Sequence, residues 1–184
     1  MTGSAAAWVV DTSTYTHLSR AGHVEVLHQV APGGIIVIPA EVHAEIQNGR
    51  DRYPGIAAPE GLLWVEQTVL TEAEAWTQLE VKAALGGGPL KHLGECAVIA
   101  CALHRGLVAV LDDRAAAAQA ELRGIESRDT MWIVIEAWAT VFDRDRDLAI
   151  AVIDALLDTD MFLPITSGAS LFAWAYEEGL LPRD

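Results

Sequence analysis

The chain has 184 residues, and its 52% hydrophobic and 21% charged content excludes a disordered or low-complexity protein. Its formal net charge of −14 favours basic partners and argues against broad electrostatic adhesion to nucleic acid or anionic membranes. Activity on nucleic acid would therefore need a local remedy, such as a metal ion or a few well-placed arginines. The segment "MTGSAAAWVVD" carries no basic leader, and no apolar run approaches ~20 residues, so we expect a cytoplasmic protein with no membrane partner.

Strands and helices are predicted to alternate from the first residues of the chain. The runs "AAAWVVD" (5–11) and "IIVIP" (35–39) are apolar throughout, which is typical of strands buried on both faces of a parallel sheet. Between them, hydroxyl and glycine signals predict helices over 12–22 and 23–31. A further helix is predicted over 40–47, with a proline at its first turn.

The middle of the chain continues this alternation. We predict a loop over 48–61, a strand over 62–70, a helix over 71–85, a flexible joint over 86–89 and a helix over 93–106. Thr71 and Glu74 have the spacing of a capping box. Cys96 and Cys101 are five residues apart in one helix, which turns them away from each other, so we expect two buried, reduced side chains.

The last part of the chain changes from alternation to helices alone. We predict a strand over 107–113, a helix over 114–124, a short edge strand over 125–129 and helices over 130–142, 147–160 and 167–181. The order predicts an α/β fold, a three-layer α/β/α arrangement with a central parallel sheet. We expect a single domain over 1–184, with a core over about 5–129 and a helical C-terminal extension over about 130–184.

Acidic residues stand where chemistry gathers in such folds, beyond the carboxyl ends of the strands. Asp11 ends the first predicted strand, and Asp112 and Asp113 end a later one. Glu45 lies in the helix after the second strand. Glu95 precedes Val98, Ile99 and Ala102 at helical spacing, which predicts a buried face, an expensive place for a lone charge.

Each acid also has a purely structural interpretation. Asp11 could cap a helix, Glu45 could be solvated, and Glu95 could complement a helix N-terminus. One of Asp112 and Asp113 could cap the next helix, but a cap needs only one of them. As a set, however, carboxylates at one sheet edge would repel unless a cation joined them. Hard divalent ions such as Mg²⁺ or Mn²⁺ prefer oxygen ligands and can assist phosphoryl displacement, so the pattern indicates a nuclease site.

Four segments, in order, resemble the PIN-domain family of metal-dependent ribonucleases, which includes VapC-type toxins of toxin–antitoxin pairs. They are "WVVDTS", "IIVIPAEVHAEI", "HLGECAVIACALHRG" and "VAVLDDRAAAA", and they cover most of residues 5–123. The resemblance implies a PIN-like three-layer fold. It also implies hydrolysis of RNA phosphodiester bonds by a Mg²⁺- or Mn²⁺-dependent endoribonuclease.

The resemblance assigns the acids one by one. Asp11 matches the family's first acid, Ser13 the supporting hydroxyl residue, Glu45 the second acid and Glu95 the third. The fourth is open: the family pattern of a hydroxyl residue, any residue and Asp selects Asp113, with Leu111 in place of the hydroxyl, but Asp112 or both could serve.

The same resemblance implies roles for these residues. Asp11, Glu95 and Asp112 or Asp113 would bind the metal, and Glu45 would bind a second ion or order the water. Arg114 would offset phosphate charge, and His92 or Lys91 could do likewise. Whether one metal or two is bound stays open.

The sequence is compatible with several kinds of partner and with one alternative function. Besides RNA, a basic antitoxin would suit the acidic chain, and the apolar stretch 130–142 is either buried by the chain's own tail or a homo-oligomer interface. An inactive PIN domain that binds RNA or protein is the alternative function. A haloacid dehalogenase-like phosphatase needs a second Asp where Ser13 stands, a response-regulator receiver needs its paired acids after the first strand, and no P-loop spacing is present.

Overall fold

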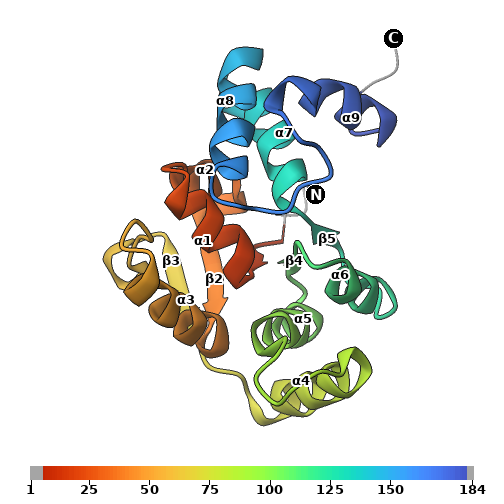
Figure 1. Ribbon diagram of the computed structural model, residues 1–184. Coiled ribbons are helices and arrows are strands. Elements are labelled where there is room, and N and C mark those ends of the chain that lie inside the picture. The colour runs from red at the N-terminus through yellow and green to blue at the C-terminus, as the bar shows by residue number, and fades with distance from the viewer. Residues whose placement is uncertain (1–5, 182–184) are drawn as a thin grey trace.

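The computed structural model of the protein describes residues 6–181 and contains a five-stranded sheet with helices on both sides (Figure 1). The strands are β1 (Trp8–Val10), β2 (Ile36–Pro39), β3 (Val65–Thr68), β4 (Val108–Val110) and β5 (Ser127–Arg128). Their order is β3-β2-β1-β4-β5, and every neighbouring pair is parallel. The predicted α/β fold with a central parallel sheet is confirmed. Residues 1–5 and 182–184 of the predicted domain lie outside the described residues, as does the first residue of the predicted strand 5–11.

The helices surround this sheet. They are α1 (Thr12–Arg20), α2 (Glu25–Val30), α3 (Ala40–Arg52), α4 (Glu72–Leu85), α5 (Leu93–Arg105), α6 (Arg114–Glu121), α7 (Thr130–Thr140), α8 (Arg146–Leu157) and α9 (Leu171–Glu177). In Figure 1, α2, α7 and α8 lie above the sheet, and α4 and α5 lie below it. The helices that follow β5 form the predicted C-terminal helical part.

The central strands account for the apolar runs in the sequence. All residues of β1, β2 and β4 are buried, as expected for parallel strands covered on both faces. In the register of the sheet, Val10 of β1 pairs with Val110 of β4. Asp11, directly after β1, and Asp112, two residues after the end of β4, therefore lie beside each other at the carboxyl edge of the sheet.

Two predicted boundaries in the middle of the chain are wrong. The predicted loop 48–61 begins inside α3, which continues through Gly49 to Arg52. Contacts with the following turn explain the extension, since the Arg50 side chain donates from Nε to the carbonyl of Ile56 at 3.2 Å. The predicted strand 62–70 shortens to β3, because it is an edge strand whose residues are only partly covered.

The last predicted helix is also shorter than expected. Residues 168–170 form a 3-10 turn before α9 because Gly168 packs directly against α8. A Cβ at Gly168 would lie 2.3 Å from the carbonyl oxygen of Ile150, and its N–H donates to Asp154 Oδ1 at 2.6 Å. This contact fixes a turn where the sequence predicted continuous helix over 167–181.

Helix α7 is the apolar stretch whose partner the sequence left open. Most of its residues are buried, and it packs against α2 and α8 of the same chain. The chain's own helices therefore cover much of its surface. Separately, no helix within residues 6–181 has both the length and the apolar character needed to cross a membrane.

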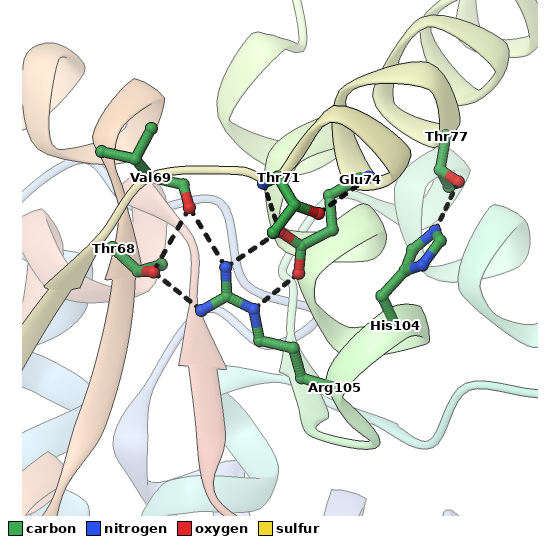
Figure 2. A network of polar contacts seen from close by, with 7 residues as sticks. All are labelled: Thr68, Val69, Thr71, Glu74, Thr77, His104 and Arg105. Atoms are coloured by element: carbon green, nitrogen blue, oxygen red, sulfur yellow. Dashed lines mark hydrogen bonds and ion pairs between the residues drawn. The ribbon is translucent and has the colours of Figure 1, made fainter.

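Arg105, the last residue of α5, ties together the turn between β3 and α4 (Figure 2). Its Nε donates to Glu74 Oε1 at 2.5 Å, and its Nη1 donates to the Thr68 hydroxyl at 2.7 Å. Glu74 also accepts from the backbone N–H of Thr71 at 2.7 Å, which completes the predicted capping box. Glu74 is only 1% exposed, and its bonds to Arg105 lower its pKa to about 2.

The two cysteines are free and buried, as predicted. Both lie in α5, whose residues from Cys96 to Ala102 are buried against the sheet and its neighbouring helices. Burial raises the pKa of each thiol to about 11, so both stay protonated and unreactive at neutral pH.

Candidate active site

A pocket of about 870 Å³ lies where β1 and β4 end. Its lining includes the carboxylates of Asp11, Glu95, Asp112, Asp113, Asp129, Asp160 and Glu178. The strand ends supply the first acid and the Asp112–Asp113 pair, and the first turn of α5 supplies Glu95. Four of the five acids selected from the sequence therefore share one pocket.

Asp11 is the most deeply buried of these acids. It is 2% exposed, and its Oδ1 accepts the N–H of Thr14 at 2.8 Å, which caps α1 as the structural interpretation expected. Its Oδ2 accepts the N–H of Asp112 at 3.2 Å. Capping uses one lone pair of one oxygen, so Asp11 caps a helix and lines the pocket at the same time.

Asp112 is held beside Asp11 by two threonines that the sequence analysis missed. The hydroxyls of Thr14 and Thr130 both donate to its Oδ2 at 2.9 Å, and the N–H of Thr130 donates to its Oδ1 at 2.9 Å. Leu111, which stands in place of the expected hydroxyl residue, is a buried apolar residue. The hydroxyls near this acid come instead from α1 and α7, and no local sequence pattern points to the contact between Thr130 and Asp112.

Asp11 and Asp112, the two inner acids of the pocket, have no compensating positive charge among the described residues. Burial raises the pKa of Asp11, and the nearby charge of Asp112 raises it further, against the hydrogen bonds that lower it. Burial likewise raises the pKa of Asp112, although the bonds from Thr130 and Thr14 lower it. Within residues 6–181, neither acid forms an ion pair with a basic side chain. A cation between them would relieve both the burial and the repulsion.

A second group of ligand atoms lies at the outer part of the pocket. One atom each of His92, Glu95 and Asp113 lies within 4.8 Å of the other two, a spacing that could hold a metal ion. Glu95 is 24% exposed at its side chain, so it faces the pocket instead of lying on a fully buried face as predicted. The sequence placed His92 near phosphate, whereas the structure places its Nδ1 3.5 Å from Glu95 Oε1.

Asp112 and Asp113 point in different directions. The Asp112 carboxylate accepts from Thr14 and Thr130 beside Asp11, whereas Asp113 reaches Glu95 and His92 and also caps α6, accepting the Ala116 N–H at 2.8 Å. Both acids line the pocket. The adjacent carboxylates therefore supply one group to each half of the site.

Glu45 lies next to this pocket and does not line it. It faces a neighbouring hollow of about 350 Å³, where its Oε2 accepts the Thr12 hydroxyl and its Oε1 accepts the N–H of Gly94 at 3.1 Å. Gly94 leaves room for this carboxylate, because a Cβ there would lie 2.5 Å from Glu45 Oε2. Burial raises the pKa of Glu45.

The two supporting residues also line the main pocket. Ser13 is the second residue of α1, and Arg114 is the exposed first residue of α6. Lys91, the other proposed phosphate contact, is exposed and lines neither the main pocket nor the hollow beside Glu45.

The C-terminal extension forms one wall of the pocket, a role that the sequence analysis did not assign to it. The segment Asp160–Pro164 and the side chains of Trp174 and Glu178 line the pocket opposite the strand ends. Phe162 in this segment is 91% exposed. An apolar, acidic tail gives no sequence signal that it turns back over a site formed more than forty residues earlier.

A family comparison agrees with this geometry. The family described as DUF3368: PIN domain matches residues 7–171. The chain belongs to the PIN-domain family. The match includes α7 and α8, so most of the helical extension falls within the family's own span. Curated proteins give no match to this sequence.

PIN domains are typically nucleases that use a divalent metal ion, and the residues of this PIN domain fit such an ion. Its donors are mainly carboxylate oxygens, which Mg²⁺ and Mn²⁺ prefer, and one imidazole. Asp11 is buried and Asp112 is partly exposed, and neither has a basic partner among the described residues, a state that a bound cation would stabilise. The carboxylates each retain lone pairs beyond those used in the hydrogen bonds above.

Proposed function

We propose that this PIN domain is a Mg²⁺- or Mn²⁺-dependent endoribonuclease. The observation that supports it most is the pair Asp11 and Asp112, a buried and a partly exposed acid so close that the charge of Asp112 raises the pKa of Asp11, in an open pocket and with no basic partner within residues 6–181. A structural role alone would favour replacing such a pair, because holding a buried carboxylate next to a second like charge is unfavourable. Binding a cation is the function that accounts for keeping both.

Two groups of carboxylates would bind the metal from opposite sides of the pocket. Asp11 and Asp112 would bind from the inner side, and Glu95 and Asp113 from the outer side, with His92 beside them. A bound ion would supply an acidified water and neutralise charge on the phosphodiester. The inner and outer groups together favour two ions over one, because each group has its own set of ligand atoms.

Three further side chains would support the metal site or contact the substrate. Glu45, held by Thr12 and Gly94, would order the water or bind a second ion. Ser13 would support the inner acids, since it contributes to lowering the pKa of Asp112. Arg114, which forms no ion pair within the described residues, is free to offset the charge of a phosphate in the pocket.

Cleavage of a panel of RNAs by the purified protein tests this proposal. We expect cleavage with Mg²⁺ or Mn²⁺ and none with EDTA. Asp11→Asn and Glu95→Gln should abolish it while the fold is retained, and Glu72→Gln, which changes an exposed acid on α4, serves as the matched control. Undiminished cleavage by either site variant contradicts the assignment, and binding without cleavage by the wild type favours the inactive, RNA-binding alternative.

We also propose that the protein is the toxin of a toxin–antitoxin pair. Its net charge of −14 suits a basic protein partner. Induced expression in a bacterial host should then arrest growth, and Asp11→Asn should relieve the arrest. Growth that is equally slow with both proteins contradicts the toxin role but leaves the ribonuclease proposal standing.

A further inference from the structure

Three hollows join into one groove across the acidic pocket. The main pocket shares His17 and Asp160 with the hollow beside Glu45. On its other side it shares Asp112, Arg114 and Trp174, among others, with a third hollow of about 290 Å³ that reaches Arg128. The acidic pocket therefore lies in the middle of this longer groove.

Each end of this groove carries an arginine stacked on an aromatic ring. At one end, the guanidinium carbon of Arg20 lies 4.0 Å from the centre of the Tyr53 ring. At the other end, the guanidinium carbon of Arg128 lies 4.7 Å from the centre of the Trp132 ring. A stacked guanidinium is held in place with its N–H groups still available at its edge, a geometry suited to phosphate.

These arginines differ from others in the chain in what they contact. Arg105 is engaged by Glu74 and Thr68, and Arg50 by Gln47 and the Ile56 carbonyl. Arg20 makes no ion pair within the described residues, and Arg128 pairs only with Glu126, an acid that is 57% exposed. An exposed pair of this kind is weak and yields easily to a phosphate.

We propose that a single RNA strand lies along this groove, with its backbone on Arg20 at one end and on Arg128 at the other. This rests on the proposed ribonuclease function, because it places the scissile phosphodiester over the acidic centre between the two arginines. Cationic contacts interleaved with aromatic rings are the pattern by which proteins hold single strands. The acidic centre repels phosphate, so the ends of the groove must provide the attraction.

Fluorescence anisotropy with a labelled single-stranded RNA of about 12 nucleotides tests the groove. Ca²⁺ replaces Mg²⁺ during binding, because it takes the same oxygen ligands, and a gel verifies that the probe stays intact. Arg20→Gln and Arg128→Gln should each weaken binding several-fold. Each should also reduce the slope of log affinity against log salt by about 0.7, and the double variant by about 1.4.

Arg146 offers a matched control. Its guanidinium lies 4.4 Å from the centre of the Phe172 ring, but it lines none of the three hollows. Arg146→Gln removes the same charge and the same type of contact, and it should leave affinity and slope unchanged. Arg20→Lys, which keeps the charge, should retain the slope, and this separates a phosphate contact from a folding defect.

These outcomes distinguish the proposed RNA-binding groove from the proposed ribonuclease activity. Unchanged salt slopes in both groove variants, or an equal loss in Arg146→Gln, overturn the groove even if the wild type cleaves RNA. A duplex of the same sequence that binds as tightly as the single strand overturns the assignment of a single strand. Reduced slopes in a protein that cleaves no RNA support the groove and contradict the nuclease.

Discussion

Two carboxylates in this protein are equally buried and have opposite electrostatic environments. Glu74 is 1% exposed and Asp11 is 2% exposed. Glu74 accepts two hydrogen bonds from the guanidinium of Arg105, which lowers its pKa to about 2 (Figure 2). Asp11 faces Asp112 instead, and burial together with that second negative charge raises its pKa.

Burial alone therefore does not distinguish a carboxylate with a structural task from one that binds a ligand. The Glu74–Arg105 pair compensates its own charge and links α5 to the turn between β3 and α4, which is a structural task. The Asp11–Asp112 pair has no compensating charge within the described residues and opens onto a pocket. The uncompensated pair is therefore the one that points to a ligand, and that ligand should be a cation.

The largest expected effect comes from neutralising one carboxylate of each kind. Asp11→Asn should reduce metal-dependent RNA cleavage by at least about 100-fold, whereas Glu74→Gln should retain the activity of its folded fraction. Mg²⁺ should raise the melting temperature of the wild type and of Glu74→Gln, because it binds only the folded state, but not that of Asp11→Asn. Thermal melts with and without Mg²⁺ measure this. Equal Mg²⁺ stabilisation of all three proteins would mean that the ion binds elsewhere.

Removing the compensating arginine should leave Glu74 uncompensated, as Asp11 and Asp112 are. Arg105→Met should lower the free energy of unfolding by about 2–3 kcal/mol, somewhat less than for a fully buried pair, because the arginine is partly exposed. The double variant Arg105→Met with Glu74→Met should regain much of this loss, since no charge then stays buried. Urea unfolding measures both. A double variant no more stable than the single one would show that the bonds to Thr68 and Val69 carry the effect.

A smaller effect is expected where the backbone makes room for an acid. Gly94→Ala places a Cβ in the space of the Glu45 carboxylate and should displace it, with a loss of cleavage of about 10-fold, the scale of about 1.4 kcal/mol. Stability should change little, because alanine favours the helix that contains it. Gly88→Ala is the control, since a Cβ there meets nothing within 4 Å. Full activity in Gly94→Ala would exclude Glu45 from the reaction.

The sequence predicted most of this arrangement because its signals were local. Uninterrupted apolar strands, the capping box at Thr71 and the acids at strand ends all follow from short-range patterns, and the structure brings Asp11, Glu95, Asp112 and Asp113 into one pocket. Patterns of this kind depend on neighbours along the chain, so the sequence alone predicts them.

What the sequence did not reveal depends on distant contacts. Thr130 reaches Asp112 across 18 residues and Thr14 reaches it across 98, so no periodicity reports either bond. The same holds for the wall around Phe162 and for the position of Glu45 beside the main pocket. The end of α3 was misplaced because Asn48 and Gly49 disfavour helix, and tertiary contacts of Arg50 outweighed that preference.

The smallest expected effect is the response of the compensated acid to low pH. A carboxyl whose folded pKa lies below its unfolded value of 4.5 stabilises the protein fully above that value, and this contribution is lost as pH falls toward the folded pKa of about 2. The stability difference between the wild type and Glu74→Gln should therefore be constant above about pH 5 and shrink below pH 4.5, by at most about 1.4 kcal/mol per pH unit. Urea unfolding of both proteins from pH 3 to pH 7 measures it, and other acids cancel in the difference. A difference that stays constant down to pH 3 would mean that Arg105 does not hold Glu74 in its ionised form. Glu74 would then not be the charge-compensated counterpart of Asp11.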